Sequence, residues 1–101
     1  MSKRLDLQAT LEGILGSRNV YFQPPASIKM KYPAIVYSRK NMTLLRANDN
    51  VYSQLPEYEL TLIDPDPDSE FIEKLLQLPY CRFDRHFTSD NLNHDVFSIN
   101  Y

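Results

Sequence analysis

The sequence predicts a single small α+β domain, an antiparallel-rich mixed sheet of about four to five strands with two helices packed on one face. The chain has 101 residues, which is enough for one hydrophobic core and too few for two. Its composition, 43% hydrophobic and 24% charged, is ordinary for a folded domain. Two stretches have helical periodicity and several others alternate as strands do. The predicted order over residues 1–101 is α-β-β-β-α-β-β.

The first helix is predicted over residues 5–15, where four apolar residues fall on one stripe: Leu7, Leu11, Ile14 and Leu15. Gly16 is a suitable stop. Residues 17–32 form a connection, in which residues 20–22 make either a short strand or a hydrophobic plug. Two consecutive prolines at 24 and 25 force an extended path there.

The middle of the chain predicts three strands. Residues 34–38 are a β-branched run, and residues 42–46 are expected to be its hairpin partner. Turn-forming residues predict an exposed loop over 46–50. Residues 57–63 alternate between apolar and polar side chains, which is typical of a strand with one buried face.

A rigid acidic turn over residues 64–70 feeds the second helix. Asp68 or Ser69 is expected to cap this helix, and Pro79 to end the helical stretch. The predicted apolar face of the helix consists of Phe71, Ile72, Leu75 and Leu76.

The last part of the chain predicts two strands around a turn over residues 89–94. Strict alternation along the first strand places Cys81, Phe83, Arg85 and Phe87 on one face and Arg82, Asp84 and His86 on the other. Strict alternation along the second strand, residues 96–101, places Phe97, Ile99 and Tyr101 on one face.

The net charge of −2 hides an uneven distribution. Residues 1–50 carry eight Lys/Arg and three Asp/Glu, a balance of +5, whereas residues 51–101 carry three Lys/Arg and ten Asp/Glu, a balance of −7. The simpler interpretation is that the halves neutralise each other within one fold. The alternative is a dipolar subunit whose positive side meets the negative side of a neighbour, head to tail, in a ring or filament.

Three catalytic or metal-binding patterns are weak. Asp64, Asp66 and Asp68 begin like a calcium loop, but prolines fill the spacers and Leu75 replaces the bidentate Glu. Cys81 and His86 are expected on opposite faces of one strand, which is unsuited to a nucleophile and its base. The polar residues around His94 do not complete a metal-dependent nuclease site, because too little chain follows for a ββα arrangement.

Other function classes lack a motif. Two glycines cannot form a phosphate-binding loop, so we expect neither cofactor nor nucleotide, and the dispersed basic residues predict no sequence-specific nucleic-acid binding. The N-terminus is not expected to be a signal peptide, and no apolar run is long enough to span a membrane. One cysteine fits a reducing compartment. The sequence therefore predicts assembly or binding rather than catalysis.

Residues 15–101 resemble a family of small tail-assembly proteins of long-tailed bacteriophages: tail terminator, tail completion and minor capsid (head-tail joining) proteins. The resemblance rests on five runs: VYFQPP (20–25), MKYPAIVY (30–37), IDPDPDS (63–69), LPYCRFDRHF (78–87) and DNLNHDVF (90–97).

The resemblance implies a structural function in the virion. A tail terminator forms a homohexameric ring on the tail tube, stops tube polymerisation and joins the tail to the head, with no catalytic activity and no cofactor. The implied partners are other copies of the chain, the major tail tube protein and a head-tail connector or head-completion protein, with the genome passing through the ring. The implied location is the tail or neck of a virion assembled in the host cytoplasm.

Two alternatives stay open, namely another neck or head-closure component and a small metal-dependent nuclease. Under the terminator interpretation, two groups of residues are expected to meet a neighbouring subunit or the tube: Arg39, Arg46, Asp49 and Tyr52 around the long hairpin loop, and Arg82, Asp84, Arg85 and His86 on the strand after Pro79.

Overall fold

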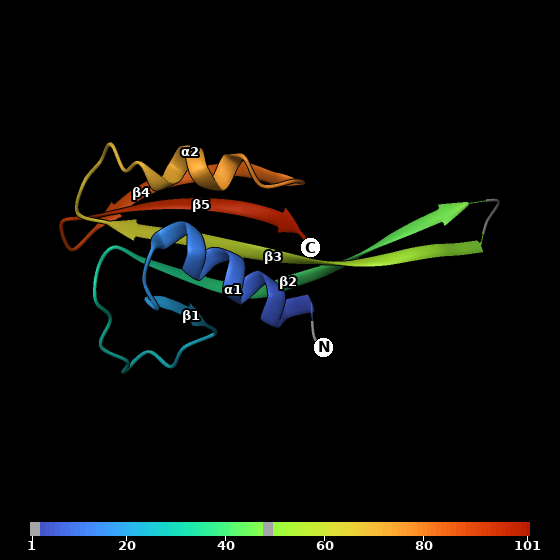
Figure 1. The fold of residues 1–101 in the computed structure, drawn as a ribbon, viewed down its shortest axis with the longest axis horizontal. Coiled ribbons are helices and arrows are strands. Elements are labelled where there is room, and N and C mark those ends of the chain that lie inside the picture. The colour runs from blue at the N-terminus through green and yellow to red at the C-terminus, as the bar shows by residue number, and fades with distance from the viewer. Residues whose placement is uncertain (1–2, 48–49) are drawn as a thin grey trace.

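The computed structural model describes residues 3–47 and 50–101, with side chains described for residues 4–40 and 56–101. Two helices lie against one face of a five-stranded mixed sheet (Figure 1). The elements are α1 (Lys3–Leu15), β1 (Val20–Phe22), β2 (Ala34–Ala47), β3 (Asn50–Asp64), α2 (Phe71–Leu76), β4 (Cys81–Ser89) and β5 (Leu92–Asn100). This confirms the predicted α+β class, with helices and strands in roughly the predicted order.

The strand order in the sheet is β1-β2-β3-β5-β4. β1 pairs with β2 in parallel, and every other pair is antiparallel. β1 covers only residues 35–37 of β2, so β4, with nine residues, is the longer edge of the sheet.

The β2–β3 hairpin is much longer than predicted. Residues 34–38 and 42–46 are one continuous strand, and their partner is the strand that ends at Asp64. A register shift between Arg39 and Asn41 lies within this strand, and the prediction that residues 42–46 pair with residues 34–38 is wrong. Beyond the rest of the sheet, residues 40–47 and 50–56 form a projecting two-stranded ribbon, which we call the arm (Figure 1).

The core lies between the helices and the sheet. Leu7 and Leu11 of α1 are fully buried, as the helical stripe predicted, and Gly16 ends the helix with a φ of 75°. Leu75 of α2 belongs to the same core cluster, which places both helices on one face. The strands contribute alternate residues to this cluster: Val20, Ile35, Tyr37, Tyr58, Leu60, Leu62, Phe97 and Ile99.

Side-chain hydrogen bonds fix the acidic turn. Asp64 accepts a hydrogen bond from the backbone N–H of Asp66, and Asp66 accepts one from Asp68, both at 2.9 Å. Ser69 Oγ accepts the N–H of Phe71 at 3.3 Å in a turn before α2, but the N-cap residue is Glu70, so neither Asp68 nor Ser69 is the cap that was predicted. Leu76 is 43% exposed, so its predicted place on the apolar face is wrong.

The β4–β5 hairpin has a tighter turn than predicted. Asp90 and Asn91, with φ of 54° and 63°, form the two-residue connection, so Asn93 and His94 belong to β5. A register shift between Phe83 and Arg85 marks a bulge at Asp84.

The prediction of which side chains share a face of β4 is therefore wrong beyond Phe83. Arg82 and Arg85 lie on the sheet face opposite the helices, which we call the open face, whereas His86 lies on the helix face. No helix in the described parts of the chain is long and apolar enough to cross a membrane.

Candidate functional site

The open face is crossed by two ion pairs that link β4 to β3. Arg82 Nη2 lies 3.1 Å from Glu57 Oε2, and Arg85 Nη2 lies 3.6 Å from Glu59 Oε1. Since β5 separates these strands, both guanidinium groups reach over it, and Ser98 beneath them is only 5% exposed. The charged side chains therefore form the outer surface on this side of the sheet.

β4 itself is almost entirely exposed. Its outer edge has no strand partner in the described sheet, and Phe83 and Phe87 are 48% and 42% exposed. Arg85 Nη1 also donates to Asp84 Oδ2 at 2.6 Å. An exposed edge with Arg and aromatic side chains is typical of an interaction surface, while charges and a bulge disfavour unspecific strand pairing.

Four residues of β4 were predicted to form one contact group, and the structure brings only some of them together: Arg82, Asp84, Arg85 and His86. Arg82 and Arg85 share the open face, and Asp84 sits at the bulge between them. His86 faces the helix side, where its Nδ1 lies 2.8 Å from the buried carboxylate of Asp95. His86 therefore pairs within its own chain and does not join the two arginines.

Four residues around the hairpin loop were predicted to form a second contact group, of which the structure describes only part: Arg39, Arg46, Asp49 and Tyr52. Arg39 is exposed, at the point where the arm leaves the sheet. It pairs with Tyr58 in the register of β2 and β3, which places it on the helix face, away from Arg82 and Arg85. The side chains of Arg46 and Tyr52, and the whole of Asp49, lie outside the described part of the structure.

A basic pocket of about 280 Å³ lies next to Arg39. It is lined by Arg4 of α1, Phe22 of β1, Gln23, Arg39 and Tyr58. Arg4 Nη1 donates to the hydroxyl of Tyr37 at 3.3 Å, and its guanidinium lies 4.6 Å from the centre of the Phe22 ring. No carboxylate is among the described residues that line this pocket, and two of those residues are arginines. No pattern in the sequence indicates that residues 4, 22 and 39 converge.

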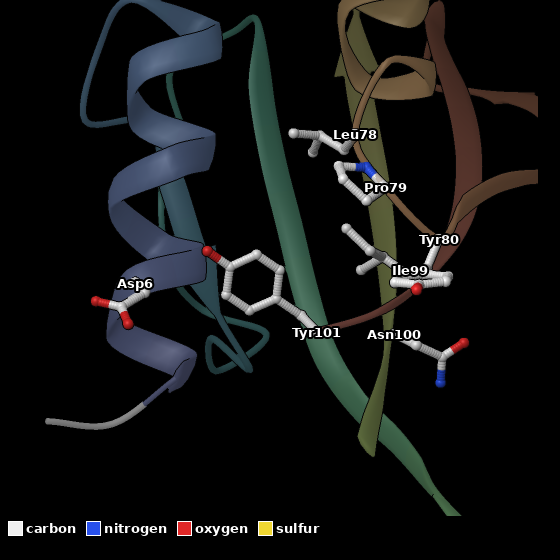
Figure 2. A pocket seen from close by; sticks show the side chains of 7 residues that line it. All are labelled: Asp6, Leu78, Pro79, Tyr80, Ile99, Asn100 and Tyr101. Carbon is white, nitrogen blue, oxygen red and sulfur yellow. The ribbon is translucent and has the colours of Figure 1, made fainter. Parts of the chain in front are cut away.

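An apolar hollow of about 370 Å³ lies between α1 and the segment before β4 (Figure 2). Its walls are formed by Leu78, Pro79, Ile99 and Tyr101, and Asp6 is the one acidic side chain among the described residues that line it. Figure 2 shows the Tyr101 ring pointing towards α1, where its hydroxyl lies 3.5 Å from Thr10 Oγ1. The hollow holds no nucleophile with an adjacent base.

Cys81 and His86 do not form a catalytic pair. The bulge at Asp84 puts both on the helix face, contrary to the prediction, but their partners on β5 are Ile99 and Asp95. Four residues of strand separate these partners, about 13 Å. Burial raises the pKa of the Cys81 thiol from 9.0 to about 11, against the smaller opposing effect of Arg82. The thiol is therefore a poor nucleophile at neutral pH.

The two histidines lie apart. His94 stacks on Phe87, with ring centres 4.6 Å apart, on the open face, whereas His86 is on the helix face. Within the described residues, no group of three or more His, Cys, Asp or Glu side chains is placed to hold a metal ion.

Comparison of the chain with protein-family models, with curated proteins and with solved structures finds no match. The functional assignment therefore depends on the geometry of the chain and on the sequence motifs.

Proposed function

We propose that the chain is a structural subunit of phage tail assembly that forms a ring, caps the tail tube and joins it to the head. The observation that carries this proposal is the arm. It projects from a body that is otherwise short, so that the chain measures 49 × 25 × 23 Å. β1 pairs only with residues 35–37 of β2, and β5 only with residues 57–64 of β3, so neither edge of the arm has a third strand in the described chain.

An isolated two-stranded ribbon is marginally stable in water. A ribbon of this length gains stability when it packs on another molecule, because its backbone edges and side chains then find partners. The arm is thus suited to reach a neighbouring subunit or the tube, and the group around it (Arg39, Arg46, Asp49 and Tyr52) is proposed to make those contacts.

The distribution of ion pairs also supports assembly. All four ion pairs between described side chains lie within residues 57–95. The exposed basic residues Lys29, Lys31 and Lys40 form no ion pair with the described acidic residues of the second half. This disfavours mutual neutralisation by direct ion pairs and supports a dipolar subunit that associates head to tail.

The surface around β4 is the proposed second contact. Arg82 and Arg85 present guanidinium N–H groups on the open face, which also carries the exposed ring of Phe87, and such side chains are enriched in protein interfaces. Under this proposal the chain has no catalytic activity and needs no cofactor. Its partners are other copies of itself, the tail tube protein and a head-tail connector, in the neck of the virion.

The experiment is a binding assay with two particles that differ in the site they offer, tail tubes without heads and filled heads without tails. Electron microscopy locates the purified chain on each. Binding at tube ends, with shorter tubes when the chain is present during polymerisation, is the expected result. Binding to heads alone would assign the chain to head closure instead, and binding to neither would contradict a role in the neck.

A further inference from the structure

The acidic turn and the basic pocket lie at opposite ends of the sheet. Asp64 ends β3 beside the start of β2, where Ile63 pairs with Ala34. Arg39, in the pocket, pairs with Tyr58 five residues further along. Five residues of strand correspond to about 16 Å, so the two charged groups cannot meet within one chain.

The acidic turn is held in one shape, with Asp64 buried and Asp66 and Asp68 exposed. Two prolines and the two hydrogen bonds through Asp64 and Asp66 restrict its backbone. Asp66 and Asp68 are exposed, and neither forms an ion pair with a described side chain. A turn that is already ordered loses little conformational freedom when it binds.

Contacts within the chain also hold Arg4 and the backbone of Arg39 at the basic pocket. Arg4 is fixed by its contacts with Tyr37 and Phe22, and Gln23 Oε1 accepts the backbone N–H of Arg39 at 3.3 Å. Two guanidinium groups that border one hollow favour an anion such as a carboxylate.

We infer that the carboxylate of Asp68 in one copy binds between Arg4 and Arg39 in the basic pocket of the next copy. Each subunit then supplies its turn to one neighbour and its pocket to the other, which is a heterologous contact that can close into a ring. This inference rests on the proposed ring assembly and specifies one contact within it.

Charge reversal tests the contact with two variants, each of which is expected to associate weakly alone and normally when the two are mixed. R39E places an acidic residue in the pocket that meets Asp68, and D68R places a basic residue in the turn that meets Arg39. Each variant alone is expected to raise the concentration needed for half-maximal association about tenfold or more. Mixed in equal amounts, the two variants can alternate so that every contact is complementary. The R39E pocket then meets the D68R turn, and the unchanged pocket of D68R meets the unchanged turn of R39E. Association is expected to return to the wild-type level.

The readout is solution mass by light scattering at low salt, with circular dichroism to confirm that each variant is folded. R18E, an exposed charge reversal away from the pocket, is the matched control and is expected to associate as the wild type does. Both variants assembling normally would overturn the contact while leaving ring assembly intact. Failure of the mixture to recover, or a wild-type chain that stays monomeric at millimolar concentration, would also overturn it. The proposed function is tested separately, by the binding assay with tail tubes and heads.

Discussion

Arg82 of β4 reaches across β5 to bind Glu57 of β3, with Nη2 and Oε2 3.1 Å apart. The same guanidinium donates through Nη1 to the side-chain oxygen of Asn100 at 3.0 Å and to the carbonyl of Tyr80 at 3.2 Å. One side chain thus ties three strands together on the open face. It is still 53% exposed, so this surface can meet a partner without rearrangement.

Reversal of charge at Arg85 is expected to block ring assembly and leave the fold intact. Its ion pairs with Asp84 and Glu59 are exposed, and such pairs contribute about 0.2–1 kcal/mol each. Thermal unfolding is expected to show a small loss of stability for R85E, while light scattering shows loss of the assembled species. R18E is the control. An R85E chain that assembles and completes tails would remove Arg85 from the interface.

Two phenylalanines on neighbouring strands differ in burial, so their replacement by alanine should cost different amounts of stability. Phe97 is fully buried, so Phe97→Ala is expected to cost about 3–5 kcal/mol of unfolding free energy. Phe87→Ala removes a side chain that is 42% exposed and stacks on His94, and we expect a loss of about 1 kcal/mol. Urea unfolding measures both values. Similar losses for the two variants would contradict the assignment of faces on β4 and β5.

The two glycines are expected to respond in opposite directions to alanine. Gly16 has a φ of 75°, so Gly16→Ala is expected to destabilise the chain by about 1–2 kcal/mol. Gly13 lies within α1 with no atom near an added Cβ, and Gly13→Ala is expected to stabilise it by about 0.5–1 kcal/mol. Denaturant midpoints report both changes. A stabilising alanine at position 16 would show that α1 does not end there in a left-handed conformation.

The Cys81 thiol is expected to react slowly with iodoacetamide. Its pKa of about 11, raised by burial from 9.0, leaves less thiolate at pH 8 than an exposed thiol has, by about 10- to 100-fold. The alkylation rate of the native chain should rise until about pH 11, whereas that of the urea-unfolded chain should level off near pH 9. A native rate that levels off near pH 9 would show an exposed thiol.

The raised pKa of Cys81 also determines whether this thiol makes the fold more or less stable as the pH rises. Because the folded chain holds the thiol proton more tightly than the unfolded chain, this group contributes stability below pH 9.0. That contribution is lost as the pH rises from 9.0 to about 11.

Much of the fold could be predicted because local periodicity and burial coincide. The stripe of Leu7, Leu11 and Leu15, the stop at Gly16 and the alternation of Phe97 and Ile99 all correspond to buried or terminating positions in the structure. The prediction for Leu76 is wrong because α2 has only six residues, and so short a helix buries a single narrow stripe.

The errors arise where the backbone departs from regular alternation. A single extra residue at Asp84 moves His86 to the other face, and no sequence pattern marks that bulge. Residues 34–38 and 42–46 were predicted to be two paired strands, yet a register shift between Arg39 and Asn41 allows one strand to run through both. The basic pocket could not be predicted because its residues come from α1, β1, β2 and β3, which only tertiary packing brings together.

Ring assembly is tested most directly by the mass of the assembled chain, measured by light scattering over a wide concentration range, alone and with tail tubes, with rings viewed by electron microscopy. We expect a closed ring of six 11.8-kDa subunits, about 71 kDa, either free in solution or at the end of a tube. A stable two-fold dimer, or a chain that is monomeric both alone and with tubes, would contradict it.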